Sequence, residues 1–173
     1  MRRAVLAACL AAAAAAADPQ PAAGPGRSVP ATAAPAAAWR IDWAGENRSW
    51  IVVAPGFGRV QPAWVATYEV AGDTESYQVA YPALAWRDAD GVIHIAAPAA
   101  RVVGPRAFDE GGQRRWWPDS FAIHPDGRVE AQDNQPDAPI NPGRVIETVD
   151  PAADPAAWRA RRNEVAAQAG NQG

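Results

Sequence analysis

The sequence predicts an all-β domain, an antiparallel sandwich or barrel of about eight or nine short strands, with a disordered N-terminal tether and a short C-terminal helix. Three observations favour this fold class. Several short runs alternate between apolar and polar residues, and Asp-Gly turns separate some of these runs. After residue 17, Leu84 is the only leucine, beside seven Ile and 14 Val. Because β-branched residues favour strands and leucine favours helices, the composition indicates a core built from strands.

The N-terminus has the pattern of a Sec-type signal peptide over residues 1–17. Arg2 and Arg3 supply a positive start, and residues 4–17 form an uncharged apolar run of 14 residues. That length suits a signal peptide and is short for a membrane span, which needs about 20 residues. With cleavage after Ala17, we expect a periplasmic or secreted bacterial protein with no transmembrane span after processing.

A second interpretation concerns Cys9, the only cysteine of the chain. The four residues that end at Cys9 resemble a bacterial lipobox, in which the cysteine would be lipidated and would anchor the protein. Cleavage after Ala17 would instead remove Cys9 and leave no disulfide and no thiol nucleophile. Both processing routes remain open at this point.

Three further segments follow the signal peptide. Residues 18–38 are mostly Ala, Pro and Gly, too poor in apolar surface to offset the entropy of ordering, which predicts a disordered linker. Residues 39–150 carry the strand pattern and form the predicted β-rich domain. Residues 151–173 hold the C-terminal helix and tail.

The strands of the β-rich domain are predicted from apolar runs and their breakers. A hairpin through residues 71–75 joins the two best alternating runs. We expect strands at residues 40–43, 50–54, 64–70, 77–81, 84–87, 92–95, 101–103, 121–123, 128–131 and 144–149, of which 40–43, 101–103 and 144–149 have weaker patterns.

Two hairpins have strong turn chemistry. Asp88-Ala89-Asp90-Gly91 and His124-Pro125-Asp126-Gly127 each separate two apolar runs. In each turn the glycine can adopt the left-handed conformation that ends a type I turn with a bulge.

The predicted helix starts after Asp154, a good N-cap, with Pro155 at the first helical position. Strong helix formers without a breaker follow over residues 156–169. Trp158 and Val165 share one face, and this narrow apolar stripe predicts light packing on the sheet or a projecting helix.

Charge and composition exclude some functions. The net charge is −3, all 16 basic residues are Arg, and no basic stripe is present, so we expect no nucleic-acid partner. Arginine without lysine, and eight Trp beside three Phe and three Tyr, are in part the codon bias of a GC-rich genome.

The chemistry-bearing residues form no recognisable catalytic or metal motif. His94 and His124 lack the close spacing of metal ligands and are expected at the surface or in a turn. Ser120 and His124 would lie about 13 Å apart along one strand, too far for a nucleophile and its base. The Asp88–Gly91 turn lacks the later acids of a calcium loop. We therefore expect no metal and no cofactor.

The best binding lead is the cluster Arg115-Trp116-Trp117. Adjacent strand residues point to opposite faces, so one Trp would be exposed beside an arginine. Such a Trp can stack on a glycan or anchor an envelope component or a protein partner. Burial of both rings at the end of the domain is the competing interpretation, while Trp43, Trp50 and Trp64 are expected in the core.

The function favoured by the sequence is an exported, non-catalytic binding or envelope-associated module. One alternative is a small envelope hydrolase that uses carboxylates such as Asp109, Glu110 and Asp119 in acid–base chemistry. Another is a closed barrel that carries a small apolar ligand.

Overall fold

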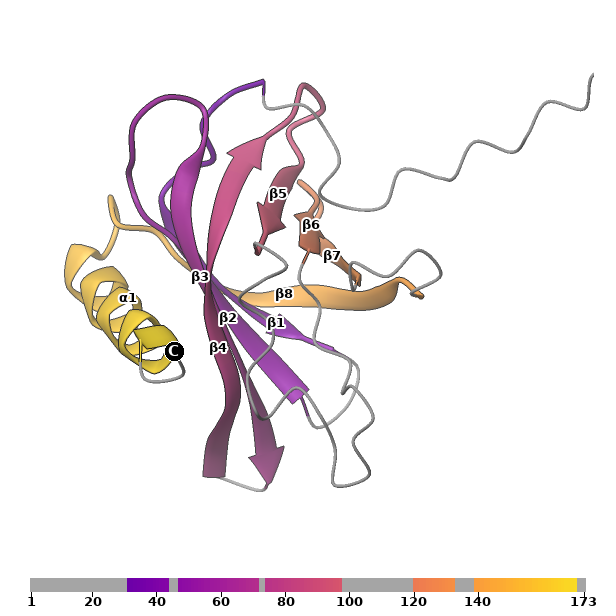
Figure 1. The fold of residues 1–173 in the computed structure, drawn as a ribbon, viewed down its shortest axis with the longest axis vertical. Coiled ribbons are helices and arrows are strands. Elements are labelled where there is room, and N and C mark those ends of the chain that lie inside the picture. The colour runs from indigo at the N-terminus through magenta and orange to yellow at the C-terminus, as the bar shows by residue number, and fades with distance from the viewer. Residues whose placement is uncertain (1–30, 44–46, 72–73, 98–119, 133–138, 171–173) are drawn as a thin grey trace, which may run out of the picture.

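The structure is a computed structural model that describes residues 31–43, 47–71, 74–97, 120–132 and 139–170. These residues form eight antiparallel strands that close into one barrel, in which each strand pairs with the next and β8 returns to β1 (Figure 1). In chain order the elements are β1 (Ala37–Asp42), β2 (Asn47–Val53), β3 (Gln61–Ala71), β4 (Thr74–Arg87), β5 (Ile93–Ala96), β6 (Ser120–Ile123), β7 (Arg128–Gln132), β8 (Asn141–Val149) and α1 (Pro155–Gly170). The all-β prediction with a C-terminal helix is confirmed, and of its two architectures the barrel is the one observed.

The strands are longer than the sequence patterns indicated. The runs predicted at 77–81 and 84–87 belong to one strand, β4, which passes through Pro82. The ladder between β4 and β5 starts at Leu84, so Pro82 lies just outside it and its missing N–H costs no bond to β5. The strand predicted at 101–103 lies outside the described residues.

The two Asp-Gly hairpins have the predicted turn geometry. Gly91 and Gly127 both have φ of 83°, in the left-handed region. The N–H of Gly91 bonds to the carbonyl of Asp88 at 3.3 Å, and that of Gly127 bonds to the carbonyl of His124 at 2.9 Å. Glycine is required at both positions because other residues adopt this conformation at a cost.

The predicted linker ends earlier than Ala38. Thr32 forms an antiparallel bridge with Arg87, Ala34 is buried, and β1 begins at Ala37. Alanine buries little surface by itself, so composition does not indicate this order; backbone hydrogen bonds to Arg87 hold Ala31 and Thr32. Residues 1–30, with the predicted signal peptide, lie outside the described residues.

Inward-facing side chains fill most of the barrel. The largest fully buried ones inside it are Tyr81, Phe121, Ile41, Ile51, Ile95, Val53, Val65 and Val129. Near the β3–β4 end, the Trp43 Nε1–H donates to Ser49 Oγ at 2.7 Å, and Ser49 Oγ lies 2.8 Å from Thr67 Oγ1. This chain gives each of these buried polar groups a hydrogen-bond partner.

Helix α1 covers the outer face of β2, β3 and β4 (Figure 1). Trp158 and Val165, the predicted face, are buried against outward-facing residues of the sheet: Ala38, Trp50, Val52, Ala66, Tyr68 and Ala80. The Asp154 Oδ1 accepts the N–H of Ala157 at 2.9 Å, which confirms the predicted N-cap. In β2 and β3, therefore, both faces are buried, one in the barrel and one under the helix.

Candidate functional site

One end of the barrel contains an open cavity, which we call the barrel mouth. At this end β1 begins, β8 ends, and the connections 54–60, 88–92, 124–127 and 150–154 cluster. The cavity has a volume of about 400 Å³. Its described lining residues are Pro35, Ala36, Ala37, Trp39, Gly91, Ile93, Ile123, His124, Pro125, Gly127, Val145, Thr148 and Asp150.

The floor of the mouth is apolar because it consists of inward-facing strand residues. Trp39 of β1 lies opposite Ile51 of β2 and Thr148 of β8 in the strand registers. Ile93 of β5 lies opposite Ile123 of β6 in the same way. Trp39, Ile93 and Ile123, together with Val145, all pack with the buried core of the barrel.

The mouth stays open because small residues and tight turns surround it. The lining includes the small residues Ala36, Ala37, Gly91 and Gly127. The two Asp-Gly hairpins meet there, since a Cβ built on Gly91 would lie 3.6 Å from Pro125 Cγ. The carbonyl of Gly127 accepts the N–H of Val145 at 2.9 Å, which ties one hairpin to β8.

Asp150 provides a fixed carboxylate at the rim. Its Oδ1 accepts the N–H of Ala152 at 2.8 Å, and its carbonyl accepts the N–H groups of Ala153 and Asp154. These bonds form the turn that leads from β8 into α1. Asp150 is itself exposed, and among the described residues none bonds its second carboxylate oxygen.

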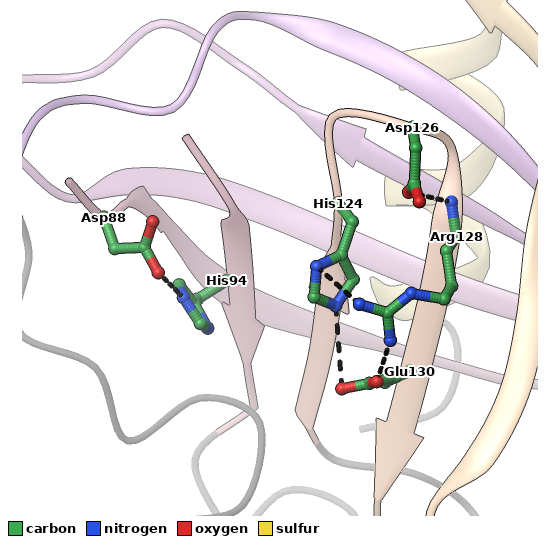
Figure 2. Close-up of polar contacts among 6 residues, drawn as sticks. All are labelled: Asp88, His94, His124, Asp126, Arg128 and Glu130. Carbon is green, nitrogen blue, oxygen red and sulfur yellow. Dashed lines mark hydrogen bonds and ion pairs between the residues drawn. The ribbon is translucent and has the colours of Figure 1, made fainter. Parts of the chain in front are cut away.

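A histidine–aspartate pair lies on the outer face of the barrel (Figure 2). His94 Nε2 and Asp88 Oδ2 are 2.7 Å apart, and the His94 ring stacks on Trp86 with ring centroids 5.6 Å apart. Asp88 Oδ1 also accepts the N–H groups of Asp90 and Val92. Burial raises the pKa of the Asp88 carboxyl, but the bonds from His94, Val92 and Asp90 outweigh it, so this pKa lies below its ordinary value.

His94 corrects one prediction. It was expected at the surface, yet it is buried with 5% of its surface exposed. Its position opposite Trp86 across the β4–β5 ladder, and the reach of Asp88 from the adjoining turn, account for the burial.

A second polar group surrounds His124 on the outer face of the β6–β7 hairpin (Figure 2). Arg128 Nη2 lies 3.1 Å from His124 Nδ1, and Arg128 Nη1 is paired with Glu130. Because a guanidinium can only donate, His124 Nδ1 is the acceptor and Nε2 carries the proton. Nε2 lies 3.6 Å from Glu130 Oε2.

The Ser120 hydroxyl, which the sequence places four residues before His124, has a backbone partner. Ser120 Oγ donates to the carbonyl of Gln132 at 3.1 Å. In the part of the chain that the structure describes, no group of three or more His, Cys, Asp or Glu residues could hold a metal ion. The Asp88–His94 pair and the His124 group each connect residues on the two sides of a hairpin turn, and these contacts stabilise the turns.

Several residues singled out by the sequence cannot be placed. The predicted binding residues Arg115, Trp116 and Trp117 lie outside the described residues, and so do the candidate catalytic acids Asp109, Glu110 and Asp119. Among the Trp residues expected in the core, Trp43 and Trp50 are buried, and Trp64 is partly buried.

The residues of the mouth were not found from the sequence. Trp39, Thr148 and Asp150 come from opposite ends of the domain and meet only because β8 pairs with β1. In the sequence these are ordinary strand residues and an aspartate in a turn. Such residues are too common to predict a binding site.

Neither a family model, nor a curated protein, nor a solved structure matches this chain. Within the described ranges, no helix has both the length and the apolar character needed to cross a membrane. The geometry of the mouth is therefore the observation on which a function can be based.

Proposed function

We propose that the protein is a non-catalytic binding module and that the barrel mouth holds one small apolar ligand. A single observation carries this proposal: the cavity is lined by inward-facing Trp39, Ile93, Ile123 and Val145. Closed eight-stranded barrels are wide enough to be filled by side chains or to hold one small ligand. Ligand cavities commonly measure about 300–1,000 Å³ and combine apolar walls with few polar groups, and the mouth has this size and character.

The volume restricts the ligand. Below the mouth the interior is filled, since Ile51, Val65, Phe121 and Val129 are fully buried. A cavity of about 400 Å³ lies near the lower end of the range of about 300–1,000 Å³ that is common for ligand cavities. This favours a compact molecule with one or two rings over a long acyl chain that would run down the barrel axis.

We also propose that the protein is located outside the cytoplasm. It is supported by the sequence pattern of residues 1–17, with a positive start and an apolar run. Mass spectrometry of the protein from its native host should then find Asp18 as the N-terminal residue. An acylated Cys9 at the N-terminus would support the anchored form instead, and an intact Met1 would contradict export by this signal.

The neutral apolar dye N-phenyl-1-naphthylamine tests binding at the mouth. We expect its emission to increase on addition of the protein, with saturation at one dye per chain. Thr148 is exposed, and its position opposite Trp39 aims its side chain at the mouth. Thr148→Trp should therefore fill the cavity and weaken dye binding at least about tenfold.

Two variants control for binding elsewhere. Ile146→Trp adds the same ring to an exposed residue of β8 that does not line the cavity. Phe57→Ala removes a fully exposed aromatic ring from the 54–60 connection. Both should bind the dye like the parent protein, whereas equal binding by Thr148→Trp would place the dye outside the mouth and reject the proposed site.

A further inference from the structure

We propose that the ligand of the barrel mouth is an organic cation, an apolar ring system that carries an ammonium group. This inference rests on the proposed function, because it assigns the chemistry of the ligand in the same cavity. The observations behind it are the charge of the lining, the geometry of Asp150 and the position of Trp39.

The formal charge of the lining is negative. Among the described lining residues, Asp150 carries a carboxylate and none is an arginine. Two arginines of the adjoining segments have protein partners: Arg128 contacts Glu130 and the lining residue His124, and Arg87 Nε donates to the Thr32 hydroxyl at 3.0 Å. An anionic ligand would thus meet the Asp150 carboxylate, while no arginine belongs to the described lining, and the whole chain, with a net charge of −3, adds to that repulsion.

The Asp150 carboxylate is held in position before a ligand arrives. One oxygen accepts the backbone N–H of Ala152, and the turn around it leads directly into the capped start of α1. No described residue bonds the other oxygen. A ligand N–H can therefore bind this oxygen without displacing a protein partner or ordering a flexible side chain, both of which would reduce affinity.

Trp39 supplies a surface for the apolar part and for the cation. It lies opposite Thr148 in the β1–β8 ladder, and Asp150 follows Thr148 by two residues at the end of the same strand. Trp39 and Thr148 thus lie at the same level of the barrel, and Asp150 lies two residues closer to the rim. Indole is the aromatic ring that attracts cations most strongly, so a cationic group beside it gains twice, from the ring and from the carboxylate.

Three probes with one ring system and different charges test this inference. They are 1-naphthylmethylamine as the cation, 1-naphthylmethanol as the neutral analogue and 1-naphthoate as the anion. Isothermal titration calorimetry at pH 7 should give a dissociation constant for the amine about three- to tenfold lower than for the alcohol, as expected for a partly exposed ion pair with a cation–π contact. The naphthoate should bind more weakly than the alcohol.

The substitution Asp150→Asn tests the contribution of the carboxylate charge alone. An asparagine keeps the oxygen that accepts the Ala152 N–H, so the turn is preserved while the carboxylate is lost. The variant should lose most of the preference for the amine, and only the contribution of the Trp39 ring should remain. The matched control is Glu147→Gln, which removes the same charge from an exposed residue of β8 that pairs with Arg40 at 3.7 Å and does not line the cavity; it should keep the preference for the amine.

The outcomes separate this inference from the proposed function. If the three probes bind the parent protein with equal affinity and Thr148→Trp weakens all of them, the mouth binds apolar ligands but the cation inference is wrong. A preference for the amine that is as large in Asp150→Asn as in the parent protein would likewise overturn the role of that carboxylate. If no probe and no dye binds, the proposed function itself fails.

Discussion

Gly143 shows how a single residue determines the packing of the barrel core. A Cβ built at this position would lie 2.4 Å from Cε3 of Trp43 and 3.0 Å from Cγ2 of Ile41. The indole of Trp43 therefore occupies the space that a side chain at Gly143 would fill. Trp43 also contacts Phe121, with ring centroids 5.9 Å apart, so a displacement of the indole would spread through the core.

Gly143→Ala should destabilise the protein by about 1–3 kcal/mol, the usual cost of overpacking a closely packed interior. Urea unfolding, followed by the intrinsic tryptophan emission, measures the change. Gly170→Ala is the matched control, since a Cβ there meets nothing within 4 Å. Equal stability of the two variants would mean that Trp43 can move aside at no cost.

Asp88 makes the stability of the β4–β5 turn dependent on pH. Its pKa in the folded protein is lowered, so the unfolded chain takes up a proton at this carboxyl before the folded protein does. The stabilisation is thus complete above the ordinary aspartate pKa of about 3.9 and is lost as the pH falls through the lower folded value.

Asp88→Asn should reduce the free energy of unfolding by about 1–3 kcal/mol at pH 7, the contribution of a hydrogen bond to a charged group. The difference from the parent protein should shrink below about pH 4. Urea unfolding at pH 7, 5 and 3 provides the comparison. Asp90→Asn, which removes the same charge from an exposed position of the turn, should show no such convergence.

At the scale of elements, the sequence predicted most strands because their determinants are local. The alternation in 64–70 and the glycines at 91 and 127 act over a few residues, and the structure confirms them. Closure is not local: Ala38 pairs with Val149 across almost the whole domain. No short pattern in either strand specifies the other, which is why sandwich and barrel were equally compatible with the sequence.

The helix illustrates the same limit. Its N-cap and its apolar face at Trp158 and Val165 could be predicted, but its full packing could not. The surface it covers includes Trp50, whose ring also lies 4.0 Å from the guanidinium carbon of Arg161. That surface is an outer face of the barrel. An alternating sequence predicts that one face of a strand is buried and the other is exposed to solvent, so it does not predict a helix on the outer face.

Trp158→Ala should lower the free energy of unfolding by about 3–5 kcal/mol, as for other buried large-to-small substitutions. The neighbouring Arg159 is exposed, so Arg159→Ala should change it by less than about 0.5 kcal/mol. Urea unfolding should be followed by far-ultraviolet circular dichroism, because Trp158→Ala removes a fluorescent indole and so changes the tryptophan emission. Similar values for both variants would show that α1 contributes little to the stability of the barrel.

At the scale of the whole molecule, the segment 31–38 belongs to the folded unit. Three backbone hydrogen bonds join Ala31 and Thr32 to Arg87, and Ala37 and Ala38 belong to the strand that closes the barrel. The candidate site depends on the same closure, because Trp39 and Thr148 are neighbours only when β1 and β8 are paired. A site of this kind cannot be predicted before the topology is known.

A chain that begins at Ala31 keeps the three backbone hydrogen bonds to Arg87 and the whole of β1, and it gives the reference free energy of unfolding. Removal of residues 1–38 should lower it by at least about 2 kcal/mol, because each backbone hydrogen bond contributes about 0.5–1.5 kcal/mol and part of β1 is also lost. Thermal and urea unfolding of the two shortened chains test this. If the chain that begins at Trp39 has the same free energy of unfolding as the chain that begins at Ala31, the assignment of residues 31–38 to the barrel is wrong.

The barrel mouth lies across the seam between the first strand and the last, since Trp39 belongs to β1 and Val145 and Thr148 belong to β8. A ligand held there would contact both sides of that seam at once. Binding and seam opening would then be thermodynamically linked, and a ligand at 100 times its dissociation constant would oppose unfolding by about 2.7 kcal/mol. Amide hydrogen exchange along β1 and β8 would slow as more of the protein binds ligand. The exchange rates of the first and last strands would therefore measure the fraction of protein that is bound.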